Sequence, residues 1–256
     1  MHEIALPTLI ALGVAAFLAG AVDAIGGGGG LIMVPALLAV GLPPHLALGT
    51  NKGQSVFGSL SAMVRFARGG MVEGRRARIT FPAAFLGSLA GAALVLILAP
   101  DALRPVVLVL LIVAAVLVMV VRPRPAEGGA TPRRHAGFLA ALIALTVGWY
   151  DGFFGPGAGT FYIAGFVALL GLPLARASAE AKVANFASNL AALILFAVRG
   201  DVIWAISLPL VGSQLLGGWV GAHLAIRKGD AFVRWVVLLV VLALVIKVAR
   251  DLYLAR

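Results

Sequence analysis

The sequence has no cysteine and little charge, and each shortage excludes a class of protein. Without cysteine there is no thiolate chemistry, iron–sulfur cluster, disulfide scaffold or structural zinc site of the usual kind. Only 12% of the 256 residues are charged, about half the share in a soluble domain, and 62% are hydrophobic. So little charge cannot cover a water-soluble surface of this size.

Long apolar runs take the place of that charge, among them residues 82–99, 106–121 and 202–225. Runs of about 20 residues can cross a hydrocarbon core of about 30 Å as helices. The first run, from Ile4 to Leu18, follows no positive charge, so we expect a membrane helix rather than a signal peptide. The fold class predicted is an all-α polytopic membrane protein.

The net charge of +10 comes from basic residues between the apolar runs. Clusters at helix ends are typical of the positive-inside rule and of contact with anionic lipid headgroups. We therefore expect the lipid bilayer as a partner, and no nucleic acid. The two main clusters are Arg68, Arg75, Arg76 and Arg78, and Arg122, Arg124, Arg133 and Arg134.

The chain matches itself at one constant offset, under which residues 27–72 fall on residues 157–202 without a gap. Lys52 then falls on Lys182, and the Gly-Leu-Pro at 41–43 on the one at 171–173. This predicts two homologous transmembrane repeats, residues 1–121 and 136–256, joined by a polar linker at 122–135.

Each predicted repeat has five apolar segments, of which the second is short and follows glycines. A short segment could be a half-helix, an arm of a re-entrant hairpin, or a spanning helix that starts inside the membrane. Equivalent loops carry opposite charge bias in two of three pairs, which favours inverted five-plus-five repeats over four-plus-four parallel ones. The segments are 4–22, 31–41, 46–66, 78–99 and 103–121, then 137–154, 160–170, 175–198, 202–225 and 231–253.

The two glycine-rich breaks are the best pointer to a transport site, because paired broken helices at matching places often hold the substrate. Free amides and the positive dipole end of a helix N-terminus attract an anion. Close helix packing is the alternative use of such glycines. The predicted binding residues in the breaks are Gly27, Gly28, Gly29, Gly30, Gly155, Gly157, Gly159 and Thr160.

Lys52 and Lys182 lie early in their predicted membrane helices, where a charged side chain is a functional hypothesis by default. Snorkelling to the interface is the alternative. The polar side chains nearby offer donors for oxyanion oxygens, or hydrogen bonds between helices. With the lysines, these complete the predicted substrate-binding set: Asn51, Gln54, Ser55, Asn185 and Asn189.

Asp23 and Asp151 precede the glycine breaks and are candidates for proton coupling, or for helix caps and charge partners of the lysines. For Glu180 the structural role is favoured. The four histidines lack metal-ligand spacing, and no catalytic or nucleotide-binding motif is present. We expect no metal, no cofactor and no enzymatic activity.

The run Gly27–Pro35, the stretch Leu48–Lys52 and the second-half stretches 152–160 and 181–189 resemble the sulfite exporter TauE/SafE family. The resemblance covers essentially the whole chain. It implies a permease of the bacterial cytoplasmic (inner) membrane that exports sulfite, sulfoacetate or a related organosulfur anion.

The functional hypothesis is a secondary transporter of a small sulfur-containing anion, working by alternating access between the two glycine breaks. A passive anion channel is the main alternative. A non-transporting scaffold would not require duplicated lysines, and an intramembrane enzyme would need a nucleophile–base pair, which the sequence does not show. A homo-oligomer is left open.

Overall fold

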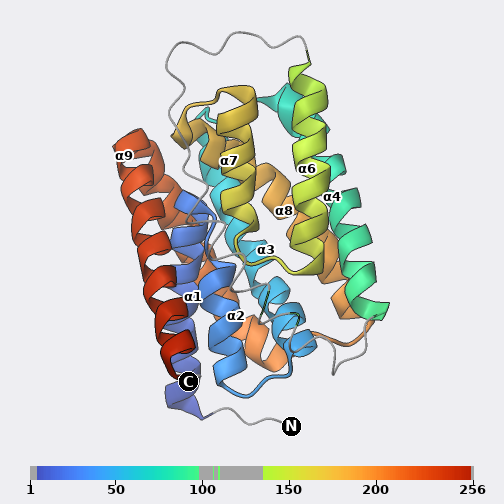
Figure 1. Cartoon of the computed structure of the whole chain (residues 1–256), viewed down its shortest axis with the longest axis vertical. Helices are drawn as coiled ribbons and strands as arrows, with labels where there is room; N and C mark the ends of the chain where they lie inside the picture. Colours follow the sequence, from blue (N-terminus) through green and yellow to red (C-terminus); the bar gives the residue numbers. More distant parts are fainter. Residues whose placement is uncertain (1–4, 98–105, 107–108, 110–134, 255–256) are drawn as a thin grey trace.

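The computed structural model describes residues 5–97, 106, 109 and 135–254, and all regular structure within them is helical (Figure 1). The expected segment at 103–121 and nearly all of the linker fall outside these residues. The helices are α1 (Leu6–Gly26), α2 (Gly30–Ala39), α3 (Pro44–Arg68), α4 (Gly74–Ile97), α6 (Ala136–Phe153), α7 (Ala158–Leu170), α8 (Leu174–Val198) and α9 (Trp204–Leu254). Gly229 interrupts α9, so its two helical parts match the two separate segments expected there.

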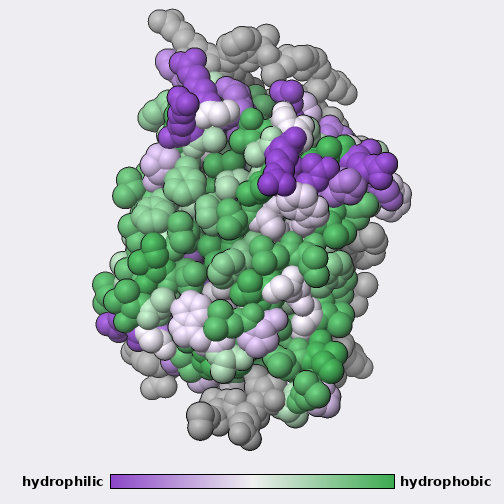
Figure 2. Space-filling model, turned by 180° about the vertical axis from the view of Figure 1, so that it is seen from behind, coloured by the Kyte–Doolittle hydropathy of each residue, from purple (hydrophilic) through white to green (hydrophobic). Residues whose placement is uncertain are grey.

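Within the described residues, five helices are long and apolar enough to cross a membrane: α1, α4, α6, α8 and α9 over Trp204–Val233. Large apolar side chains on α1 stay exposed at every fourth position, namely Leu6, Ile10, Val14 and Leu18. Figure 2 shows a broad hydrophobic band around the molecule, with hydrophilic residues gathered toward one end. An apolar stripe of this kind needs lipid to cover it. The prediction of a polytopic helical membrane protein is confirmed.

Helix bounds in the two halves follow the offset of the self-match closely. Helix α3 begins at Pro44 and ends at Arg68, and both bounds of α8 are the positions that the same offset assigns. The first residues of α1 and α6 correspond in this way, as do those of α4 and α9. In Figure 1, α6 runs downward along the chain whereas α1 runs upward. The inverted repeat stays a prediction, and these bounds and directions support it.

The two short segments form helices that begin in the middle of the molecule. Helix α2 has 10 residues and α7 has 13, and from mid-height they point toward opposite ends (Figure 1). Gly27 and Gly157 adopt positive φ angles of 79° and 85° just before them, a conformation that disfavours other residues. The glycines thus end one helix and start the next at membrane depth.

Glycines also let helices of opposite halves approach each other closely. On α4, Gly87 and Gly91 lie against the backbone of α6, where a Cβ atom would collide with main-chain carbonyls. On α9, Gly217 and Gly221 lie against α1 in the same way. Small residues permit such contacts between membrane helices. As a result, the first helix of each half packs on the fourth helix of the other half.

Candidate functional site

The two glycine breaks touch at the centre of the molecule. Gly27 packs directly on the backbone of Gly159 and Thr160, leaving no room for a Cβ atom on Gly27. The Thr160 hydroxyl donates a hydrogen bond to the carbonyl oxygen of Gly26 over 2.7 Å. The N-termini of α2 and α7 therefore lie next to each other, as the sequence predicts for a shared anion site.

Lys52 of α3 pairs with Asp151 at the end of α6. Its Nζ lies 2.6 Å from one carboxylate oxygen, and both side chains are only 2% exposed. The same Nζ donates to Asn189 Oδ1 over 3.0 Å. The other oxygen of Asp151 accepts hydrogen bonds from Asn185 over 3.2 Å and from the hydroxyl of Ser188. Such bonds make a buried ion pair tolerable, because they replace part of the lost hydration.

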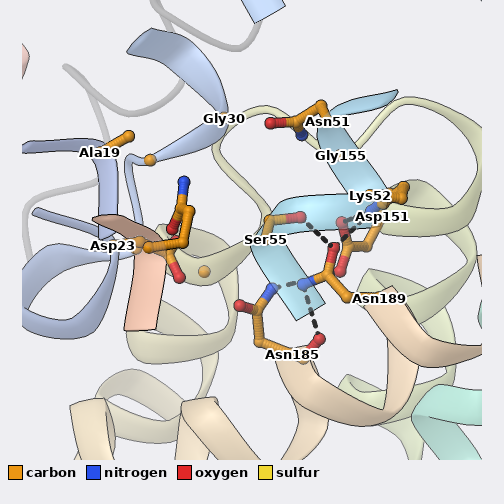
Figure 3. A pocket seen from close by; sticks show the side chains of 14 residues that line it. Ala19, Asp23, Gly30, Asn51, Lys52, Ser55, Asp151, Gly155, Asn185 and Asn189 are labelled. Carbon is orange, nitrogen blue, oxygen red and sulfur yellow. Dashed lines mark hydrogen bonds and ion pairs between the residues drawn. The ribbon is translucent and has the colours of Figure 1, made fainter. Parts of the chain in front are cut away.

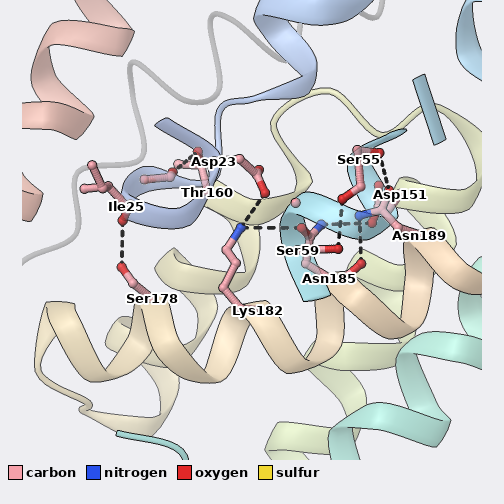
Figure 4. Close-up of polar contacts among 12 residues, drawn as sticks. Asp23, Ile25, Ser55, Ser59, Asp151, Thr160, Ser178, Lys182, Asn185 and Asn189 are labelled. Carbon is pink, nitrogen blue, oxygen red and sulfur yellow. Dashed lines mark hydrogen bonds and ion pairs between the residues drawn. The ribbon is translucent and has the colours of Figure 1, made fainter. Parts of the chain in front are cut away.

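Lys182 of α8 makes the reciprocal pair with Asp23 of α1 (Figure 4). Its Nζ lies 2.8 Å from Asp23 Oδ2 and 3.4 Å from Asn185 Oδ1. Each lysine is thus neutralised by an aspartate from the other half of the chain. Both ammonium groups are directed into the protein by these contacts, so neither lysine extends its side chain to the membrane interface.

A small polar cavity lies between these pairs and the glycine breaks (Figure 3). Its volume of about 20 Å³ is room for about one water molecule, so a larger ligand requires the site to open. Twelve of the predicted residues line it: Asp23, Gly27, Gly29, Gly30, Asn51, Lys52, Ser55, Asp151, Gly155, Gly159, Asn185 and Asn189.

The other predicted residues lie around this cavity without lining it. Gly28, Gly157 and Thr160 belong to the helix starts, Lys182 binds the lining residue Asp23, and Gln54 is fully buried elsewhere on α3.

Two polar residues at the site are absent from the binding residues predicted from the sequence. Ser188 binds Asp151, and Gln214 of α9 lines the cavity. Ser188 occupies the same helix as Asn185 and Asn189, so its position on the chain was an available signal. Gln214 had none, because its repeat-related position is Ala84 and no motif surrounds it.

Glu180 does have a structural role, but its partner is not one of the lysines. Its Oε1 accepts hydrogen bonds from the Glu73 amide over 2.8 Å and from Arg76 over 3.0 Å. Glu180 and Lys182 lie two positions apart on one helix, so their side chains point in different directions. Glu180 instead joins α8 to the start of α4.

Known proteins resemble this chain over nearly its full length. The model of the family described as sulfite exporter TauE/SafE matches residues 12–248. The chain belongs to this family.

Curated relatives carry names of the same kind. "Probable membrane transporter protein YfcA" of Escherichia coli (strain K12) is 41% identical over 237 residues, which cover 92% of this chain and 87% of the relative. "Probable membrane transporter protein ORF9" of Sinorhizobium sp is 37% identical, covering 98% and 96%. A "Probable membrane transporter protein" of Haemophilus influenzae is 36% identical, covering 97% of both. No solved structure matches the chain significantly.

This TauE/SafE member is therefore a multi-pass membrane transporter of the bacterial inner membrane, and its family and relatives indicate transport rather than enzymatic activity. In the arrangement described, two lysines and two aspartates sum to zero charge around the cavity.

Proposed function

We propose that the protein transports sulfite or an organosulfur anion such as sulfoacetate by alternating access around the central cavity. The observation that carries this proposal is the pair of crossed lysine–aspartate contacts beside two helix N-termini. A sulfonate or sulfite oxygen is a suitable partner for Lys52, which lines the cavity, and for the amides at the starts of α2 and α7.

The crossed contacts also provide what alternating access needs, namely interactions that can be exchanged. Lys52–Asp151 and Lys182–Asp23 each join the two predicted repeats, so movement of one repeat against the other must break or remake them. The cavity holds little more than a water molecule, which favours a carrier with a closed state over an open anion channel.

Proton coupling through the aspartates is part of this proposal. Protonation of Asp151 removes its negative charge and leaves Lys52 free to bind the anion, so one proton accompanies each anion. Lys52 is the cation that binds Asp151. Asp23 is the second candidate and binds Lys182.

Counterflow in proteoliposomes tests the transport proposal. Vesicles loaded with unlabelled sulfoacetate should transiently accumulate labelled sulfoacetate, because a carrier exchanges its cargo whereas a channel does not. The double variant Lys52→Met, Lys182→Met should lose about 90% or more of this uptake, since a charged hydrogen bond contributes about 1.5–3 kcal/mol.

Lys228→Met is the matched control, because Lys228 is exposed near the end of the first part of α9 and lies over the ring of Phe232. Its uptake should equal that of the unaltered protein. Full uptake by the double variant contradicts the charge role of the lysines, and equilibration without accumulation identifies a channel.

A further inference from the structure

Helices α3 and α9 run side by side in the same direction and form a seam. At the end where both helices begin, which is the lower end in Figure 1, the amide of Ile203 donates to the hydroxyl of Thr50 over 3.0 Å. Further along, Ser61 donates to the carbonyl oxygen of Leu215 over 2.8 Å. Gly58, between these contacts, lies against Gln214. The face of α3 that carries residues 50, 54, 58 and 61 therefore faces α9.

Polar atoms without a hydrogen-bond partner gather in the lower part of this seam. Within the described residues, six buried side-chain atoms lack a partner, and four of them are here: Asn51 Oδ1, Gln54 Oε1, Gln54 Nε2 and Ser207 Oγ. Gln54 and Ser207 are fully buried, and Ser207 faces Gly53 across the seam.

Such atoms normally have a protein group or an ordered water molecule as partner. Buried amides and hydroxyls in proteins are almost always hydrogen-bonded, either to protein groups or to ordered water. An unbonded glutamine offers two donors and an acceptor to whatever lies beside it. Above Gln214 the hydroxyl of Ser61 does have hydrogen-bond partners, namely the carbonyl oxygens of Leu215 and Gly58. The unpartnered polar atoms of the seam therefore lie in the stretch between the cavity and the lower ends of α3 and α9.

The seam between α8 and α4 shows that this polarity is not required by the architecture. It is anchored in the same way, because the Glu73 amide donates to Glu180, and these two positions are the repeat equivalents of Ile203 and Thr50. At the same offset, four polar side chains of the first seam correspond to alanine. Asn51, Gln54, Ser207 and Gln214 correspond to Ala181, Ala184, Ala77 and Ala84.

The polar seam is continuous with the central cavity, since Asn51 and Gln214 both line that cavity. We propose that the lower part of the α3–α9 seam is a hydrated path through which a small anion passes between the cavity and the end of the molecule where α3 and α9 begin. The identity of the anion rests on the proposed function, whereas the hydration of the seam does not.

The accessibility of introduced cysteines to a thiol reagent tests the path. The chain has no native cysteine, so only the introduced thiol reacts. Ser207→Cys and Gln54→Cys each place a thiol in the seam. Ala84→Cys and Ala184→Cys are matched controls in the α4–α8 seam, at positions that are equally buried. The probe is sulfonatoethyl methanethiosulfonate, a water-soluble thiol reagent that itself carries a sulfonate.

Both seam cysteines should react at least about tenfold faster than both controls in the folded protein, since reagent access limits the rate at a buried thiol. They should also react faster with this reagent than with its trimethylammonium counterpart. Equal rates in the two seams overturn the path, and preference for the cationic reagent overturns its use by anions.

Folding and transport are checked on the same proteins. Unmodified Ser207→Cys is nearly isosteric and should elute as a single species and retain sulfoacetate counterflow, which modification should then block. If Gln54→Cys fails to fold, the comparison of Ser207→Cys with Ala84→Cys decides alone. If the seam cysteines react but the protein shows no counterflow, the hydrated path is supported and the proposal that sulfoacetate is transported is contradicted. Counterflow that survives full modification of Ser207→Cys overturns the path as the route of the anion.

Discussion

At the scale of single residues, the two intramembrane lysines are not equivalent. Lys52 lines the cavity and binds Asp151 and Asn189, whereas Lys182 does not line the cavity and binds Asp23, which does. Asp151 is fixed by three donors, while Asp23 is 20% exposed. An anion in the cavity therefore competes with Asp151 for Lys52, and the second pair remains a contact between the predicted repeats.

This difference predicts which aspartate couples transport to protons. With acid outside and no membrane potential, the unaltered protein should accumulate sulfoacetate. Asp151→Asn should lose this pH-driven accumulation but keep exchange, because an asparagine leaves Lys52 permanently free of a carboxylate. Asp23→Asn should keep both. Measured uptake in proteoliposomes checks this, and pH-driven accumulation by Asp151→Asn would exclude Asp151 as the coupling group.

At the scale of elements, the sequence was informative where a signal was local or repeated. Expected segments at 31–41 and 160–170 correspond to α2 (Gly30–Ala39) and α7 (Ala158–Leu170), because glycine runs mark their starts. The repeat offset likewise predicts that α3 and α8 correspond, and their bounds differ by that offset.

The sequence indicates Asp23 and Asp151 as candidate charge partners of the lysines, but it does not show which aspartate pairs with which lysine. Lys52 and Asp151 are 99 positions apart, and Lys182 and Asp23 are 159 apart. The self-match does not align the two aspartates either, because Asp23 falls on Phe153 and Asp151 falls on Ala21. Long-range pairs of this kind depend on how the helices cross, which a single sequence does not record.

The contact between the glycine breaks is the element-level feature most sensitive to a side chain. Gly27→Ala should destabilise the protein through a positive φ and through collision with Gly159. Gly41→Ala is the matched control, because Gly41 has a φ of 90° but open space around it. We expect Gly41→Ala to lower the free energy of unfolding by about 1–2 kcal/mol through backbone strain alone. Gly27→Ala should lower it clearly more and should abolish counterflow.

Thermal unfolding in detergent, followed by loss of the single-species elution peak, measures the difference between these two variants. Equal melting temperatures and equal counterflow would mean that the backbone contact between the breaks is not needed.

At the scale of the whole molecule, the two halves interlock rather than lie side by side. Helix α1 packs on α9 and α6 packs on α4, through glycines at equivalent positions of the two predicted repeats. The exposed arginines Arg68, Arg75 and Arg78 lie where α3 ends and α4 begins, and Arg227 and Lys228 lie near Gly229. The start of α9 is bonded to the opposite end of α3, at Thr50.

This distribution predicts the orientation in the membrane, since basic residues concentrate on the cytoplasmic side. The start of α4 should be cytoplasmic, and the start of α9 should face the periplasm. Gly74→Cys and Ala205→Cys place exposed thiols at these two positions of the cysteine-free chain. An impermeant maleimide should label Ala205→Cys in intact spheroplasts and Gly74→Cys only after lysis. Because Gly74 and Ala205 lie in the first turns of corresponding helices, labelling of both from one side would contradict inverted repeats, and reversed labelling would contradict the charge-based orientation alone.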